Sequence, residues 1–128
     1  MHNIGTVLAA RTSSKRLPGK ALLTLGGIPM IEFIIKRIKG SNLGGQLIFA
    51  TTTNKTDDYL AKFVENLSVH VFRGDENDLV KRYLDIAEKY SLEYLVRITG
   101  DCPFIDSFSL DYCLSQIDQK LDFDLWTT

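Results

Sequence analysis

Residues 4–20 read IGTVLAARTSSKRLPGK, a mainly apolar run followed directly by a strongly basic loop. The apolar residues 4–10 are typical of a buried strand. Residues 11–20 contain no acid and carry the cations Arg11, Lys15, Arg16 and Lys20. Ligands of open α/β sheets bind where the strands end, so a charged loop at this point is a candidate binding segment.

The rest of the chain alternates between short apolar runs and longer stretches of helical period. Further strands are predicted over 46–52, 69–72 and 94–100, and 122–128 reads as the start of another. Helices are predicted over 30–39, after a cap at Thr56, after a cap at Asp78, and over about 107–119. This alternation predicts an α/β fold, a Rossmann-like α/β/α arrangement of three layers around a mostly parallel sheet.

Two of the predicted helices have well-defined apolar faces. The first should bury Met30, Ile31, Ile34, Ile35 and Ile38, with Pro29 at its first turn. The helix capped by Asp78 should turn inward Leu79, Val80, Tyr83, Leu84, Ala87 and Tyr90.

Composition limits the class of protein. The chain has 128 residues, 45% of them hydrophobic, and a net charge of −1, which suits one domain over 1–128 and gives no overall field for nucleic acid or an anionic membrane. No apolar run approaches the roughly 20 residues of a membrane helix, and the amino terminus lacks the basic start of a signal peptide. Cys102 and Cys113 have no CxxC spacing, so we expect reduced thiols and a cytoplasmic protein.

The basic loop has the chemistry of a phosphate site. Arginine binds phosphate oxygens in pairs and lysine supplies a point charge. Ser13 and Ser14 add hydroxyls, and Gly19 lets the backbone approach a ligand closely. The charge alone is equally compatible with a solvated surface loop, and neither GxxxxGK[ST] nor GxGxxG is present.

A second charged loop follows the strand predicted over 94–100. In RITGDCPFID (97–106), Asp101 stands at the strand end. Mg²⁺ is held by one or two carboxylates together with substrate phosphates, although a Gly-Asp pair at a strand end is as often a turn. The sequence shows neither a Ser-His-Asp catalytic triad nor a Cys-His pair that could supply a nucleophile.

Several segments together resemble the cytidylyltransferase family, the CMP-sugar synthetases, and most closely its spore-coat polysaccharide (SpsF-type) members. The segments are ARTSSKRLPGKAL with LGGIPMIEFIIKRI, then ATTTNKTDD, VFRGDENDLVKRY and VRITGDCPFID, in the family's order. The resemblance covers nearly the whole chain. It implies a nucleotide-diphospho-sugar transferase fold that binds CTP over the strand ends.

The resemblance also implies an activity and roles for single residues. The activity is transfer of a cytidylyl group from CTP to a sugar, with Mg²⁺ and release of pyrophosphate, for surface or spore-coat polysaccharide. By matching positions, Arg11, Arg16 and Lys20 would hold the triphosphate and Asp101 would bind Mg²⁺. Ala9 and Ala10 would lie beside the base, and Arg73 and Asp78 would belong to a second segment on the nucleotide side.

Relatives in this family continue well beyond residue 128, so the chain resembles their amino-terminal part. The expected partners are CTP, a sugar, and either a second copy or a complementary carboxyl-terminal polypeptide, but neither nucleic acid nor a membrane. Two alternatives stay open. One is a CTP-binding fragment, or half of a split enzyme, without catalysis of its own. The other is a nucleotidyltransferase of the same fold that uses another base.

Overall fold

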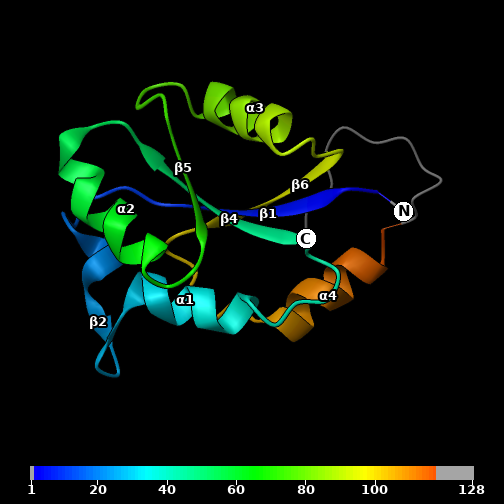
Figure 1. The fold of residues 1–128 in the computed structure, drawn as a ribbon. Helices are drawn as coiled ribbons and strands as arrows, with labels where there is room; N and C mark the ends of the chain where they lie inside the picture. The colour runs from blue at the N-terminus through cyan, green and yellow to red at the C-terminus, as the bar shows by residue number, and fades with distance from the viewer. Residues whose placement is uncertain (1, 118–128) are drawn as a thin grey trace.

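The computed structural model describes residues 2–117, and its centre is a parallel sheet of four strands. The strands are β1 (Ile4–Ala9), β4 (Gln46–Thr52), β5 (His70–Gly74) and β6 (Tyr94–Thr99). They pair in the order β5-β4-β1-β6, with every pair parallel (Figure 1). The predicted parallel sheet is confirmed, whereas the strand expected over 122–128 lies outside the described residues.

Helices cover both faces of this sheet. They are α1 (Met30–Ile38), α2 (Asp58–Glu65), α3 (Leu79–Lys89) and α4 (Ser107–Ser115). Figure 1 shows α3 on one face and α1, α2 and α4 on the other. The three-layer prediction is therefore confirmed. Helix α4 ends at Ser115, earlier than the predicted residue 119. The N–H groups of Gln116 and Ile117 bond to carbonyls only three residues back, which tightens the last turn.

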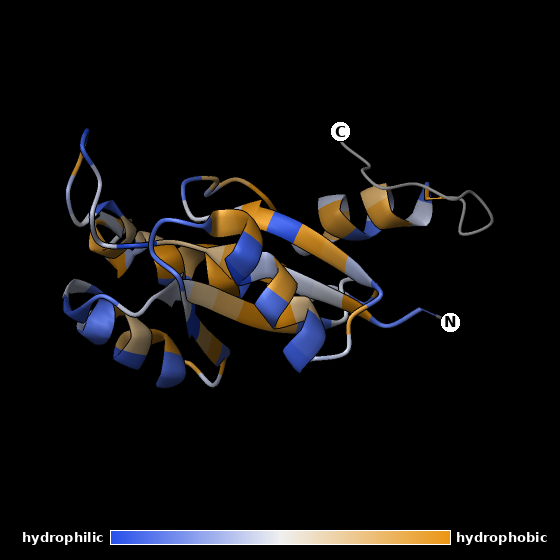
Figure 2. Ribbon diagram, turned by 90° about the horizontal axis from the view of Figure 1, so that it is seen from above, coloured by the Kyte–Doolittle hydropathy of each residue, from blue (hydrophilic) through white to orange (hydrophobic). Residues whose placement is uncertain are grey.

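The core has one cluster on each face of the sheet. Leu8 and Phe49 face α1 and α2, whereas Val7 and Ile48 face Ile86 of α3. Helix α1 buries the five apolar residues expected from its period. Figure 2 shows hydrophobic residues along the central strands and hydrophilic ones in many of the peripheral loops. Strands β1 and β4 are therefore buried on both faces.

A small hairpin that the sequence analysis missed connects the basic loop to α1. Strands β2 (Thr24–Leu25) and β3 (Ile28–Pro29) pair antiparallel. Gly26 and Gly27 form the turn, with φ of 59° and 89°, values that glycine adopts readily. A Gly-Gly pair between apolar residues is a hairpin signal, so this element was open to prediction.

The predicted inward face of α3 is partly wrong. Val80 and Leu84 are 68% and 64% exposed, and Leu79 is 37% exposed, whereas Ile86 and Arg82 are buried. The guanidinium of Arg82 turns inward because its Nε and Nη2 donate to the carbonyl of Asp75, at 3.0 and 2.7 Å. This rotation takes the first apolar residues of α3 away from the sheet.

Of the two predicted helix caps, one is confirmed and one is wrong. Asp78 accepts from the N–H of Lys81 at 2.8 Å and caps α3. Thr56 does not cap α2, because its hydroxyl and its N–H both donate to Asn54 Oδ1, each at 3.0 Å. Asn54 therefore caps a short 3-10 turn, Lys55–Asp57, that leads into α2.

Candidate nucleotide site

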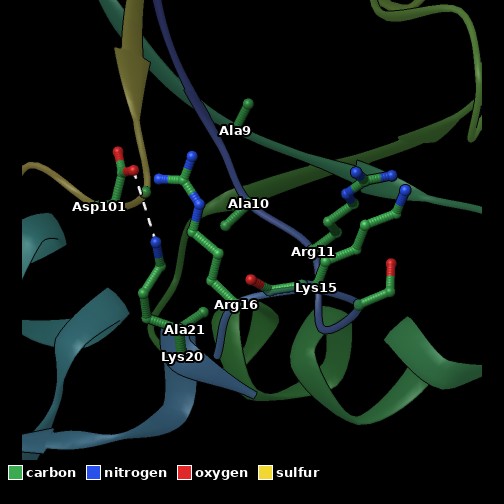
Figure 3. Close-up of a pocket in the computed structure, with 11 residues that line it drawn as sticks. Ala9, Ala10, Arg11, Lys15, Arg16, Lys20, Ala21 and Asp101 are labelled. Carbon is green, nitrogen blue, oxygen red and sulfur yellow. Dashed lines mark ion pairs between the residues drawn. The ribbon is translucent and has the colours of Figure 1, made fainter. Parts of the chain in front are cut away.

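A pocket of about 400 Å³ opens where β1 and β6 end (Figure 3). Nine of the residues singled out from the sequence line this pocket, and Gly19 does not. The nine are Ala9, Ala10, Arg11, Ser13, Ser14, Lys15, Arg16, Lys20 and Asp101, and Ala21 and Gly100 complete the lining. Residues from two distant parts of the chain thus meet at one edge of the sheet, as expected for parallel strands.

The register of the sheet brings these two parts together. Ala9 pairs with Thr99 at the ends of β1 and β6, and the N–H of Gly100 donates to the carbonyl of Ala9 at 2.9 Å. A Cβ at Gly100 would lie 2.6 Å from that of Ala10. Glycine is therefore needed at residue 100 if Asp101 is to lie beside the basic loop.

The basic loop is closed at its base by the main chain. The N–H of Gly19 donates to the carbonyl of Thr12 at 2.9 Å, and Gly19 has a φ of 70° with open space around it. Lys20 then begins a 3-10 turn, Lys20–Leu22, in which Ala21 is buried. The loop is a closed arch, and its basic side chains project from a fixed base.

Most of the positive charge on this loop is not neutralised. Lys20 Nζ lies 3.5 Å from Asp101 Oδ2. No carboxylate within residues 2–117 forms an ion pair with Arg11, Lys15 or Arg16. Figure 3 shows Arg16 and Lys20 extending toward the end of β6, while Arg11 and Lys15 extend on the other side of Ala10. Such a concentration of unpaired cations attracts a polyanion.

Asp101 is suited to bind a metal that arrives with a phosphate ligand. A hydrogen bond with the Thr99 side chain holds the pKa of Asp101 below its usual value; partial burial opposes the effect and Lys20 adds to it. The carboxylate is therefore charged at neutral pH. In the described part of the chain, no group of three or more acids, histidines or cysteines is placed to hold a metal. One carboxylate fits Mg²⁺ whose other ligands are phosphate oxygens and water.

Arg73 and Asp78 do not line this pocket. Arg73 donates to the carbonyls of Thr52 and Asn54, both at 2.8 Å, and pairs with Asp58 at 2.7 Å. Asp78 caps α3. Both residues therefore order the loops after β4 and β5, and their roles toward a nucleotide stay predictions.

The sequence analysis did not single out Asp57, which lies behind the basic loop. Its side chain is only 1% exposed, and its Oδ1 accepts from the N–H of Thr12 at 2.7 Å. Asp57 lies within the ATTTNKTDD segment (50–58), but its partner Thr12 is distant in the sequence, so no local pattern distinguishes it from its neighbours.

Two further observations concern the cysteines and the helices. Cys102 and Cys113 are both free in the structure. Among the described helices, none combines the length and the apolar character that crossing a bilayer requires.

Comparison with known proteins places these residues in a family context. A family model described as cytidylyltransferase matches residues 6–126. An uncharacterised protein of Methanocaldococcus jannaschii is 41% identical over 122 residues, which are 95% of this chain and 50% of that protein. The spore coat polysaccharide biosynthesis protein SpsF of Bacillus subtilis is 32% identical over 128 residues, covering 96% of this chain and 53% of SpsF.

The fold has a counterpart among solved structures. A cytidylyltransferase from Leptospira borgpetersenii superposes with a TM-score of 0.86 at 38% identity, covering 91% of this chain and 49% of the other. The chain thus spans about half the length of the relatives it matches. The α/β fold is shared over that half.

Proposed function

The chain belongs to the cytidylyltransferase family, and from this premise we propose that its pocket binds the triphosphate of CTP for transfer of a cytidylyl group to a sugar. The observation that carries the proposal is the pocket itself. Three cations without a carboxylate partner in the described residues surround it, and a fourth lies 3.5 Å from Asp101. A nucleoside triphosphate carries comparable charge of opposite sign.

The residues predicted from the sequence have the following parts in this proposal. Arg11, Arg16 and Lys20 contact the triphosphate, and Ser13 and Ser14 donate hydrogen bonds to it. Gly19, whose N–H is bonded to Thr12, lets the loop approach the triphosphate closely. Ala9 and Ala10 are small residues at the end of β1, where a base can lie against the backbone. Arg73 and Asp78 shape the neighbouring loops through the contacts described above.

The reaction needs positioning and charge neutralisation more than covalent help from the protein. A sugar hydroxyl oxygen bonds to the α-phosphorus, the bond from that phosphorus to the bridging oxygen breaks, and pyrophosphate leaves with the negative charge. Lys20 offsets the charge that develops on the leaving group. Asp101 would hold Mg²⁺, which when bound neutralises phosphate charge. The hydroxyl proton passes to solvent, and we assign no residue as its base.

The proposed pathway is synthesis of surface or spore-coat polysaccharide. Its support is the 32% identity to SpsF, a spore coat polysaccharide biosynthesis protein. A second candidate is CTP binding without turnover, in this chain alone or in one half of a split enzyme. The pocket and its cations support CTP binding equally with or without turnover.

Calorimetric titration with CTP, UTP, GTP and ATP, with and without Mg²⁺, tests the proposal. We expect CTP to bind most tightly. Lys20→Ala should weaken CTP binding about tenfold, the effect of losing one partly exposed charge pair. The matched control is Lys36→Ala, which removes an exposed lysine that pairs with Glu32 on α1.

Pyrophosphate release across a panel of sugars then separates the two candidates. Release that depends on CTP and one sugar supports the enzyme. If the chain binds CTP but releases no pyrophosphate, and a carboxyl-terminal polypeptide restores the release, the result supports the second candidate, CTP binding without turnover. Equal affinity for all four nucleotides, or none for CTP, contradicts the proposal.

A further inference from the structure

Asp57 is a buried acid that lies directly behind the basic loop without lining the pocket. It ends the Lys55–Asp57 turn before α2, and its side chain is 1% exposed. A buried carboxylate is costly unless hydrogen bonds and charges compensate for the lost water. Its partners therefore show what the acid holds in place.

Those partners come from the basic loop and from the end of β4. Asp57 Oδ1 accepts from the N–H of Thr12 at 2.7 Å, and Oδ2 accepts from the hydroxyl of Thr52. The Thr12 hydroxyl donates in turn to the carbonyl of Thr56 at 3.0 Å. The first residues of the basic loop are thus tied twice to the turn that carries Asp57.

Thr12 is also the residue on which the loop closes. Its carbonyl accepts from Gly19 at 2.9 Å, so the peptide groups on both sides of Thr12 are held, one by Asp57 and one by Gly19. Arg11 directly precedes Thr12, and Lys20 directly follows Gly19, the residue that bonds to the Thr12 carbonyl. The position of Thr12 therefore sets where the cations project.

The carboxyl of Asp57 is charged in the folded protein. Burial by itself raises its pKa, but hydrogen bonds from Thr52 and Thr12 and the nearby Arg73 outweigh burial and hold the pKa below its usual value. A charged carboxylate binds an N–H more strongly than a neutral acceptor does. The anchor is thus a charge-assisted bond that bulk water scarcely reaches.

We propose that Asp57 is a positioning residue for the triphosphate: it touches no nucleotide, but it fixes Thr12 so that the loop cations converge on one polyanion. This inference rests on the proposed function, because it assigns to that same pocket the residue that keeps it in shape. Asp57→Ala removes the anchor, Asp57→Asn keeps an acceptor without the charge, and Asp58→Asn is the control. Asp58 is the exposed neighbour that pairs with Arg73.

Two measurements without nucleotide test the anchor itself. One is the exchange rate of the Thr12 amide by NMR, and the other is tryptic cleavage within residues 11–20. We expect Asp57→Ala to exchange about tenfold faster at Thr12, as loss of one charged hydrogen bond implies, and to be cut faster. Asp57→Asn should be intermediate, and Asp58→Asn should match the wild type.

The third measurement is the ratio of the affinities for CTP and CMP. A displaced loop loses triphosphate contacts but keeps those to the base, so we expect Asp57→Ala to lower this ratio about tenfold, and Asp57→Asn to lower it less. If Asp57→Ala does not fold, Asp57→Asn alone decides the test. Wild-type exchange at Thr12 in a folded variant, or equal losses for CTP and CMP, overturns the inference. If the wild type binds no CTP, the proposed function and the positioning role both fall; Thr12 exchange then still reports whether the anchor itself exists.

Discussion

Replacing Asp101 with asparagine should change CTP affinity in opposite directions with and without Mg²⁺. Asp101 Oδ2 lies 3.5 Å from Lys20 Nζ, and the Asp101 side chain is 55% exposed. Without the metal, its charge repels the triphosphate and occupies Lys20, so its removal should strengthen binding. With the metal, the same carboxylate is the proposed Mg²⁺ ligand, so its removal should weaken binding.

The size of both effects follows from the charges. Unit charges about 5 Å apart interact with about 1 to 3 kcal/mol for effective dielectric constants of about 80 to 20. Exposure and salt place Asp101 at the low end of this range. We therefore expect about fivefold tighter binding of CTP without Mg²⁺. The double charge of the ion doubles the interaction free energy, which corresponds to about 25-fold in affinity. The lost repulsion of the triphosphate offsets about fivefold of this, so we expect binding about fivefold weaker with Mg²⁺.

Isothermal titration calorimetry of CTP in EDTA and in excess Mg²⁺ measures both constants. Asp85→Asn is the matched control, because Asp85 pairs with Lys81 on α3 and its loss removes the same charge outside the pocket lining. Raising the salt concentration should shrink the effect seen in EDTA. A change of the same sign in both buffers would refute the placement of Asp101 beside the triphosphate.

Two further predictions concern stability. Gly45→Ala should lower the free energy of unfolding by about 3 kcal/mol or more, because a Cβ there would lie 1.8 Å from the carbonyl oxygen of Ile4 at a φ of +64°. The control Gly27→Ala has a φ of +89° and open space around it, so it should lower the free energy of unfolding by only about 1 kcal/mol. Urea denaturation measures both changes, and equal losses would contradict this account. The pKa values of Asp57 and Asp101 are lowered in the folded state. The two charged carboxylates therefore stabilise the fold above the unfolded pKa of about 3.9. This stabilisation is lost as the pH falls through the lower pKa values of the folded state. Urea midpoints should therefore fall below about pH 4, and Asp57→Asn should flatten that fall; parallel profiles would count against the charged state of Asp57.

The parts of the fold that could be predicted are those with a long, regular pattern. Strands β1 and β4 are covered on both faces, so their residues form nearly continuous apolar runs. Helix α1 has its whole apolar face against the core. The β2–β3 hairpin was missed because strands of two residues are too short to show a period, although Gly26 and Gly27 mark its turn.

Helix α3 shows where a regular pattern misleads. Its period is helical, and its start at Asp78 was correct. Its rotation, however, depends on Arg82, whose guanidinium satisfies the carbonyl of Asp75 inside the protein. Period analysis assigns arginine to the solvent face, so it also assigned Val80 and Leu84 to the wrong face.

The candidate site also has a part that the sequence predicts and a part that it does not. The meeting of the cations with Asp101 could be predicted because their loops follow β1 and β6, and parallel strands bring their carboxyl ends together. Asp57 was not predicted, because it binds the loop across 45 positions of sequence and no local pattern carries that contact. The charge run therefore predicts which residues line the pocket, whereas the buried acid that bonds to the loop behind them is visible only in three dimensions.

The contrast between the exposed cations of the basic loop and the buried Asp57 predicts how nucleotide binding and stability are related in the protein. Arg11, Lys15 and Arg16 are exposed, so solvent screens their mutual repulsion, and the buried core lies in the sheet and the helices against it. Changes to these cations should therefore alter nucleotide affinity and leave the free energy of unfolding nearly unchanged. Asp57 is expected to affect both affinity and stability, because its buried carboxylate accepts hydrogen bonds from the Thr52 hydroxyl at the end of β4 and from the N–H of Thr12. A substitution there should change stability and triphosphate affinity together, whereas substitutions in the arch should separate them.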